Sequence, residues 1–332
     1  MTYIPKFTIS SKAMRLMMEI AAALERYKIV MEGPAGVRLR KLNHIRTIRG
    51  TTAIEGNTLT EEQITAFLSG KRVIAPKREI EEVRGAHLAY SKIEQFNPFL
   101  LTDLKKAHAL LTKGLVDRPG EFRKCRVGVI NGAGEVIHLA PNFEFVPGLM
   151  DDLFAWLNDS EEPLLIRSCV FHWCFEDIHP FADGNGRTGR LWQTAILGKW
   201  NPLFYAAPVE NIVWAHQQEY YAAIRAVEAN DMDISPFIDF MLDKILRTLK
   251  AKGEAYAAEH SKSDLKSDLK SSLKNECKIL AIIRKVPKVT IPELVDATKL
   301  SRSGVKKILQ RLRDANRLRR IGPDKGGYWE VV

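Results

Sequence analysis

The chain has 332 residues, of which 45% are hydrophobic, so it can bury at least one sizeable core and we expect two or three folded units. No window approaches the roughly 18 consecutive apolar residues of a membrane span, and the first residues lack the apolar run of a secretion signal, so we expect a cytoplasmic protein with no membrane partner. The net charge of +10 is concentrated at the C-terminal end, where residues 275–332 hold 14 Lys or Arg against 6 Asp or Glu. The four cysteines lack zinc-site spacing and the density of a disulfide scaffold, which favours free thiols.

The first half of the chain predicts a mainly helical fold. A capping box at Thr60–Gln63 opens a short helix, and Gly56 with Asn57 ends the helix before it. Apolar residues at helical spacing predict longer helices over 13–27, 37–54, 80–96, 101–111 and 149–157.

One segment departs from the helical pattern. Residues 127–139 place two β-prone runs around Asn131–Gly134, which predicts a β-hairpin. The pattern alone leaves two interpretations open, a surface hairpin without a role and a flap over a neighbouring cleft.

Residues 178–190 read IHPFADGNGRTGR and lie between two apolar helical stretches. Pro180 ends the first helix near His179, and the loop then leads into the start of the second helix. Glycines in such a loop let backbone N–H groups approach an anion, and a helix N-terminus favours negative charge. The segment therefore predicts a phosphate site.

The side chains of this segment complete the chemistry. Arg187 and Arg190 share one helix face and can clamp a polyphosphate. Asp183 offers the carboxylate that Mg²⁺ commonly uses beside phosphate oxygens. His179 is then the candidate base, because a neutral imidazole can take a proton from an attacking hydroxyl.

The last part of the chain predicts a separate unit behind a linker. Residues 251–274 include a Ser-Asp-Leu-Lys repeat with little capacity to form a core, although leucines at i,i+4 spacing could form a stripe for packing or homodimer formation. Three predicted helices and a hairpin follow over 275–332. Residues 290–310 resemble the helix-turn-helix of winged-helix domains, so DNA contacts over 290–325 and purely protein contacts are both open. The basic side chains expected at phosphates are Lys306, Lys307, Arg311, Arg313, Arg319, Arg320 and Lys325.

The segment from His179 resembles the Fic family signature H-P-F-x-[DE]-G-N-G-R-x-x-R at every specified position. The resemblance extends over about residues 40–245 and implies a helical Fic core over 99–250, preceded by a helical region over 1–98. It also implies a protein adenylyltransferase that uses ATP with Mg²⁺, with His179 as base and Asp183 on the metal. The residues it places around the phosphates are Gly184, Asn185, Gly186, Arg187 and Arg190.

The same resemblance implies three further roles. Residues 51–57 fit the inhibitory motif [ST]-x-x-x-E-[GN], so Glu55 is expected to pair with Arg190 and displace the γ-phosphate of ATP. Asn211 and Tyr220 are expected to border the adenine. In the hairpin, the residues on which an extended target segment would lie as an added strand are Val136, Ile137 and His138.

The sequence supports more than one function. The first is transfer of AMP to a Ser, Thr or Tyr hydroxyl of a target protein or of the chain itself. Transfer of another phosphate-containing group remains open, as does removal of AMP with Glu55 aligning a water. A rival of a different class is a DNA-binding regulator whose Fic core senses ATP.

Overall fold

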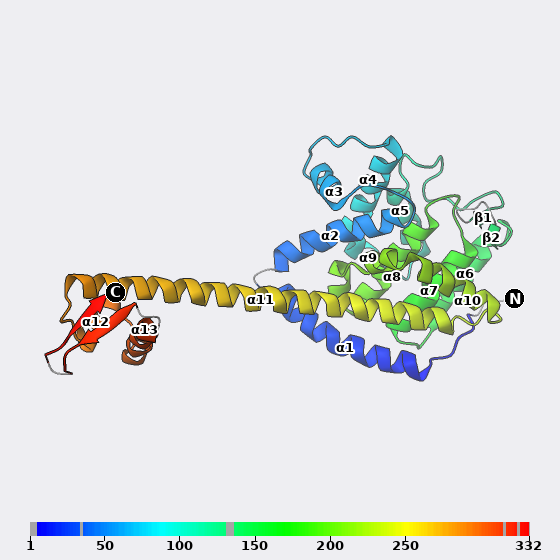
Figure 1. The fold of residues 1–332 in the computed structure, drawn as a ribbon. Helices are drawn as coiled ribbons and strands as arrows, with labels where there is room; N and C mark the ends of the chain where they lie inside the picture. The colour runs from blue at the N-terminus through cyan, green and yellow to red at the C-terminus, as the bar shows by residue number, and fades with distance from the viewer. Residues whose placement is uncertain (1–4, 34–35, 131–135, 315–316, 324–325, 332) are drawn as a thin grey trace. The chain divides into compact units, whose positions relative to one another are not determined.

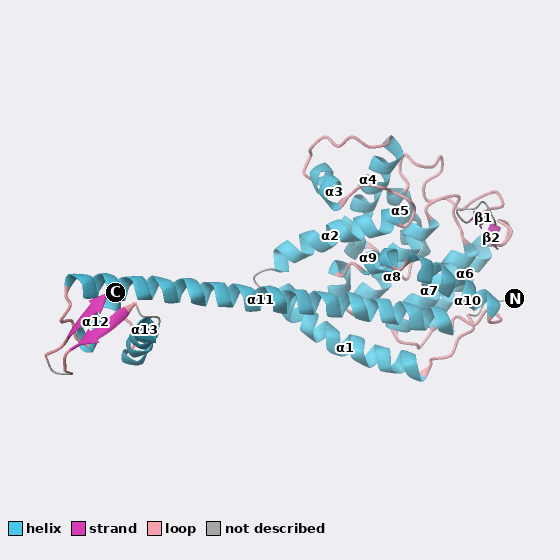
Figure 2. Ribbon diagram, in the orientation of Figure 1, coloured by secondary structure: helices cyan, strands magenta, loops and turns pink. Residues whose placement is uncertain are grey.

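A computed structural model describes residues 5–33, 36–130, 136–314, 317–323 and 326–331, and it divides into two compact units, Met1–Glu254 and Ala255–Val332. Both units are mainly helical, and each of their two small sheets is a pair of strands (Figure 1, Figure 2). No helix in the described residues is long and apolar enough to cross a membrane.

The helices at the start of unit 1 follow the predicted periodicities. Short segments that the apolar periodicity did not predict lie between them. The helix expected over 80–96 is shorter, because α4 ends at Ser91 and a 3-10 turn, Ile93–Gln95, follows. The elements up to the hairpin are α1 (Ser11–Glu32), α2 (Gly36–Ala53), α3 (Glu61–Leu68), α4 (Lys77–Ser91) and α5 (Leu101–Leu111).

The predicted capping box is present, since Thr60 accepts from the N–H of Gln63 and the Gln63 side chain accepts from the N–H of Thr60. Gly56 adopts a positive φ of 92° in the turn that ends α2, as its place in the sequence predicts. The predicted hairpin is also present as β1 (Gly128–Ile130) and β2 (Val136–Leu139), paired antiparallel, and its turn lies outside the described residues.

The second half of unit 1 is a stack of helices around one apolar core. Two of them, α7 (Leu164–Ile178) and α8 (Asn185–Trp200), pack against each other at its centre and are buried along most of their length (Figure 1). This burial on all sides fixes the loop that joins them, since both of its ends belong to the core. The remaining elements are α6 (Val146–Asp159), η2 (Pro202–Ala206), α9 (Val209–Ala215), α10 (Gln217–Ala229) and α11 (Ser235–Lys285).

Unit 2 has the helices and hairpin of a winged helix. It contains the end of α11, then α12 (Ile291–Thr298), α13 (Arg302–Asp314) and the antiparallel strands β3 (Leu318–Ile321) and β4 (Tyr328–Val331). Its own core includes Leu294, Val305 and Leu309, so it folds around a separate apolar cluster. The backbone of the predicted linker is helical and forms part of α11, as the leucine spacing allowed.

Candidate active site

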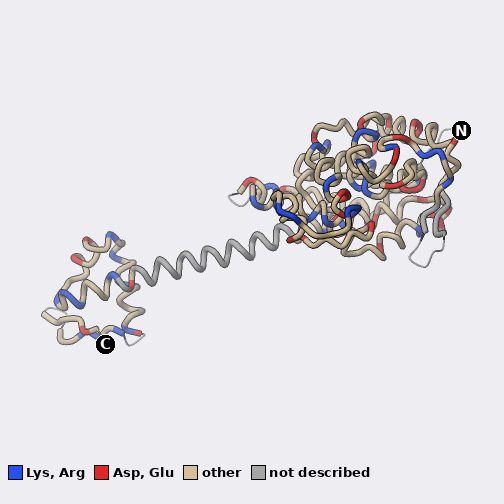
Figure 3. The backbone as a smooth tube through the Cα atoms, turned by 90° about the horizontal axis from the view of Figure 1, so that it is seen from above, with Lys and Arg blue, Asp and Glu red and all other residues tan. Residues whose placement is uncertain are grey.

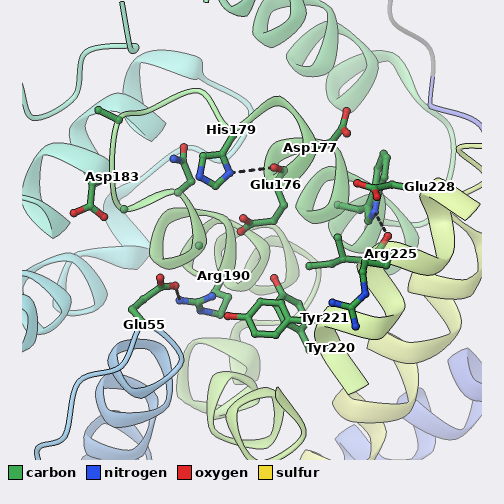
Figure 4. A pocket seen from close by; sticks show the side chains of 16 residues that line it. Glu55, Glu176, Asp177, His179, Asp183, Arg190, Tyr220, Tyr221, Arg225 and Glu228 are labelled. Atoms are coloured by element: carbon green, nitrogen blue, oxygen red, sulfur yellow. Dashed lines mark hydrogen bonds and ion pairs between the residues drawn. The ribbon is translucent and has the colours of Figure 1, made fainter. Parts of the chain in front are cut away.

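The loop between α7 and α8 turns sharply at His179. This residue caps α7 in the left-handed region, with φ 47° and ψ 60°, and Pro180 follows it. A left-handed conformation costs a non-glycine residue roughly 1–2 kcal/mol, so the surrounding contacts must hold it. The turn places His179 at the rim of a pocket that the start of α8 also lines (Figure 4).

Gly184 makes the entry into α8 possible. It is the N-cap residue with φ 85°, and a Cβ added there would lie 2.5 Å from the side chain of Thr112. The N–H groups of the first helical turn have no intrahelical acceptor, Gly184 supplies no capping side chain for them, and Gly184, Asn185 and Gly186 line the pocket. This helix start is suited to bind an anion.

Asn185 stabilises the loop with its side chain. Its Oδ1 accepts from the N–H of Phe181 at 2.8 Å, and its Nδ2 donates to the carbonyl of Phe181 at 2.8 Å. The amide is 1% exposed, so both of its polar ends are used inside the protein. Any contact of Asn185 with a phosphate therefore comes from the main chain.

A hydrogen bond sets the tautomer of His179. Its Nδ1 lies 3.2 Å from the carbonyl oxygen of Glu176 (Figure 4). Because a carbonyl oxygen only accepts, Nδ1 carries the hydrogen and donates it, and Nε2 is the basic nitrogen of the ring. That is the protonation state a general base requires.

Arg190 is buried and bound to the last turn of α2 and to the turn that follows it. Its Nη2 donates to Glu55 Oε1 at 2.6 Å and to the carbonyl of Thr51 at 3.0 Å, and its Nε donates to Thr51 Oγ1 at 3.2 Å (Figure 4). Burial acts to lower the pKa of Arg190, but Glu55, Tyr220 and Glu176 together outweigh it and the pKa is raised. The Glu55 carboxylate also lies directly against Gly186, at the helix start that would receive a phosphate.

Asp183 and Arg187 form a second ion-pair group beside the pocket. Arg187 Nη2 donates to Asp183 Oδ1 at 3.0 Å, and Arg78 of α4 donates to Asp183 Oδ2 at 2.6 Å. Burial alone would raise the pKa of Asp183, but Arg187 and Arg78 outweigh burial and lower it. Arg187 is 1% exposed and is not among the described residues that line the pocket, so it faces Asp183 and Glu82 here rather than the pocket.

His108 supports the loop, although no motif in the sequence singles it out. Its ring stacks on Phe181 at 3.6 Å between centroids, its Nδ1 accepts from the N–H of Gly120 at 2.8 Å, and its Nε2 donates to the carbonyl of Asp183 at 2.9 Å. Burial lowers the pKa of His108 to about 4, so the ring is neutral near pH 7 and both hydrogen bonds persist.

The far wall of the pocket comes mainly from α10 and α7. Tyr220 lines it, as expected for a residue near the base of a nucleotide, beside Tyr221, Ile224 and Trp173. Asn211 is not among the lining residues in the described part of the chain, and its place beside the adenine stays a prediction. It lies on α9, with its backbone packed close to Gly50 of α2.

Comparisons with known proteins find matches for both units of the chain. The Fic/DOC family model matches residues 98–197, and a winged helix-turn-helix DNA-binding model matches residues 273–319. A crystal structure of a Fic family protein from Desulfovibrio desulfuricans G20 is 37% identical, with a TM-score of 0.73 over 99% of this chain and 98% of that one. The chain belongs to the Fic/DOC family.

Other members of the Fic family match a smaller part of the chain. A protein named protein adenylyltransferase Fic from Culex quinquefasciatus is 32% identical over 224 residues, which are 64% of this chain and 42% of that protein. The protein adenylyltransferase fic-1 of Caenorhabditis elegans is 31% identical over 218 residues, or 61% of this chain and 40% of that one. The chain thus spans less than half the length of these relatives.

Glu176 is a Fic-pocket residue that the sequence did not single out. Its carboxylate packs over Gly189, lines the pocket, and has one oxygen without a hydrogen-bond partner among the described residues. Burial raises the pKa of Glu176 to about 7, with Glu55 adding to the rise and Arg190 opposing it. Two acidic side chains therefore share one guanidinium in this pocket.

His172 is a core histidine of α7. It is fully buried, Nδ1 lies 2.6 Å from Gln193 Oε1, and Nε2 lies 2.9 Å from the hydroxyl of Tyr220. Its two partners satisfy both ring nitrogens, so it fixes Tyr220 in the pocket wall. In the hairpin, Val136, Ile137 and His138 belong to β2, and their side chains lie outside the described residues.

Proposed function

We propose that this chain transfers AMP from ATP to a hydroxyl side chain of a protein, itself included. The observation that carries the proposal is the placement of a basic nitrogen, His179 Nε2, beside the uncapped start of α8 and the guanidinium of Arg190. The Culex and Caenorhabditis relatives are named protein adenylyltransferases, which supports the same reaction.

In the proposed step the hydroxyl oxygen attacks the α-phosphorus of ATP and the bond to the β-phosphate breaks. The hydroxyl proton passes to His179 Nε2, and pyrophosphate leaves with the bonding electron pair. The N–H groups at Gly184 and Gly186 would stabilise the charge on the phosphate oxygens, and Arg190 would hold the outermost phosphate. Most of the rate then depends on alignment, because the protein supplies little covalent chemistry.

Asp183 is the residue proposed to hold Mg²⁺. The described residues contain no group of three or more acidic, His or Cys side chains that could hold a metal alone, but nucleotide-bound Mg²⁺ needs only one or two carboxylates beside phosphate oxygens and water. The lowered pKa of Asp183 keeps it ionised for this role, and its ion pair with Arg78 would have to open. A bound Mg²⁺ would neutralise charge on the phosphates.

Glu55 is proposed to inhibit this reaction. Its carboxylate already holds Arg190 and lies against Gly186, so it takes the place of an anion at the helix start. Thr51, which is fully buried, binds the same guanidinium, and Gln217 donates to the carbonyl of Ile54 at 2.8 Å. These contacts fix the turn that carries Glu55, so ATP must bind with its γ-phosphate displaced and its α-phosphorus misaligned.

The hairpin of β1 and β2 is proposed to bind the target segment. An extended segment can add to a strand edge through main-chain hydrogen bonds, with little demand on its sequence. Strand β2 would supply that edge with Val136, Ile137 and His138. The segment that precedes the hairpin in the chain contacts the backbone of His179 through Arg123.

The transfer is tested with ATP labelled on either the α- or the γ-phosphate. In the Glu55→Gly form, label from the α-phosphate should enter protein and label from the γ-phosphate should appear in pyrophosphate. Incorporation of the γ-label would instead make the chain a phosphotransferase. Competition with GTP, CTP and UTP in the same assay measures base selectivity.

We infer a second function, DNA binding, for the C-terminal unit, because residues 273–319 match a winged helix-turn-helix DNA-binding model. On α13, Lys306, Lys307 and Arg313 are exposed, while Val305 and Leu309 on its other side are buried. Basic side chains thus gather on the free face of the helix expected to meet phosphates, and Figure 3 shows where Lys and Arg lie in the unit.

Replacing both Lys306 and Lys307 by Gln should weaken binding of the full chain to duplex DNA. If each lysine contacts one phosphate, the slope of log affinity against log salt should fall by about 2, since each contact contributes roughly 0.9. Fluorescence anisotropy over a salt series measures the slope. Lys278→Gln, which removes an exposed charge from α11 outside the helix-turn-helix, should leave it unchanged. Affinity that does not depend on salt would contradict phosphate binding.

A further inference from the structure

Arg123 is a buried arginine whose charge is bound by backbone carbonyls. It is 4% exposed, and burial lowers its pKa. Its Nε donates to the carbonyl of His179 at 2.8 Å, and its Nη2 to that of Ile178 at 3.3 Å. The other contacts run to the carbonyls of Cys125, from Nη1 at 2.9 Å, and Pro141, from Nη2 at 2.5 Å.

Two of these carbonyls belong to the turn that carries the base. The last carbonyls of a helix have no intrahelical partner and form its negative end, so a guanidinium there is favourable. The main-chain N–H of Arg123 also donates to the carbonyl of Pro180 at 2.9 Å. Arg123 therefore binds three consecutive residues, 178–180, and stabilises the left-handed conformation of His179.

The other two carbonyls flank the hairpin. Cys125 precedes β1 and Pro141 follows β2, so the same guanidinium ties both ends of the hairpin to the backbone of His179. A lysine could not replace it, because an ammonium has three donors at one point, whereas the guanidinium spreads five donors over a rigid plane.

We propose that Arg123 is a positioning residue that couples the target-binding hairpin to the catalytic base. The proposal rests on the proposed AMP transfer and adds how the target hydroxyl is aligned with Nε2. A target strand laid on β2 is held at a fixed distance from His179 only while both hairpin ends and the turn share this anchor. The contacts of Arg123 given above do not include the start of α8, where ATP is proposed to bind, so nucleotide binding should not depend on Arg123.

The test uses the full chain with Glu55→Gly, into which Arg123→Met or Arg123→Lys is added. Arg123→Met should lower kcat by about 100-fold, the cost of a misplacement near 1 Å, with little change in ATP affinity by calorimetry. Arg123→Lys should give an intermediate rate. Hydrogen exchange should quicken together at the hairpin amides and at the amides of Ile178 and His179.

Arg167→Met is the matched control. Arg167 lies on α7, has a pKa lowered by burial as Arg123 does, and donates to the carbonyl of Leu157 at 2.8 Å, away from the hairpin. The Arg167→Met substitution should lower the melting temperature without quickening hydrogen exchange at the hairpin. Faster exchange at residues 178 and 179 alone, or ATP affinity lost in step with kcat, would overturn the coupling. If the Glu55→Gly parent incorporates no AMP, the proposed function fails. The hydrogen-exchange result still tests whether Arg123 couples the hairpin to the turn at His179.

Discussion

Glu55→Gly should raise the rate of AMP incorporation, into the chain itself or into a target, by about 10- to 100-fold. A hydrogen bond to a charged group contributes roughly 1.5–3 kcal/mol, and each 1.36 kcal/mol corresponds to about tenfold in rate. The substitution frees Arg190 for the γ-phosphate and removes a negative charge from the helix start at Gly186. Incorporation of α-labelled ATP, followed over time at matched protein concentration, measures the gain.

Two variants separate charge from bulk at this position. Glu55→Gln keeps the size of the side chain but removes its charge, so it should give a rate between those of the wild type and Glu55→Gly. Glu61→Gln serves as the control, because Glu61 forms its ion pairs with Arg46 and Arg49 at the start of α3. Equal rates for the wild type and Glu55→Gly would refute inhibition by this carboxylate.

The helical fold and the centre of the site follow from local sequence. Period-3.6 patterns, the capping box at Thr60 and the break at Pro180 depend on residues within a few positions of one another, so the sequence predicts them. The pairing of Glu55 with Arg190 was predictable only through the family motif, since 135 residues separate the two.

The residues that hold the site in place could not be predicted. Arg123, His108 and Arg78 reach the loop from 56 to 105 positions away, and their partners are mostly backbone carbonyls, which carry no sequence signal. Spacing along the chain also does not say which side of α9 faces the pocket, so the role of Asn211 at the adenine stays a prediction. The buried environment of Glu176 likewise depends on the packing of α7 against Gly189 of α8.

Replacing His179 should have the largest effect of any single change, a loss of about 10²- to 10⁴-fold in transfer, the usual contribution of a general base. The assay uses the Glu55→Gly background, where activity is highest. Binding of ATP should remain, because the phosphate donors belong to the start of α8 and to Arg190. Calorimetry of ATP binding beside α-label incorporation separates the two effects.

The residue that replaces His179 distinguishes loss of the catalytic base from a change in the backbone conformation of the turn. His179 has φ 47°, which alanine adopts at a cost of roughly 1–2 kcal/mol, whereas asparagine tolerates this region better and is no base. His179→Asn and His179→Ala should therefore lose transfer equally, and only His179→Ala should melt earlier. His216→Ala is the control, because its Nδ1 also lies near a helix carbonyl, 2.9 Å from that of Ile212, outside the residues that line the pocket in the described chain. If His179→Asn transfers AMP at the rate of the parent, another group must accept the hydroxyl proton. If both variants lose AMP transfer but still bind ATP, the proton acceptor is Nε2.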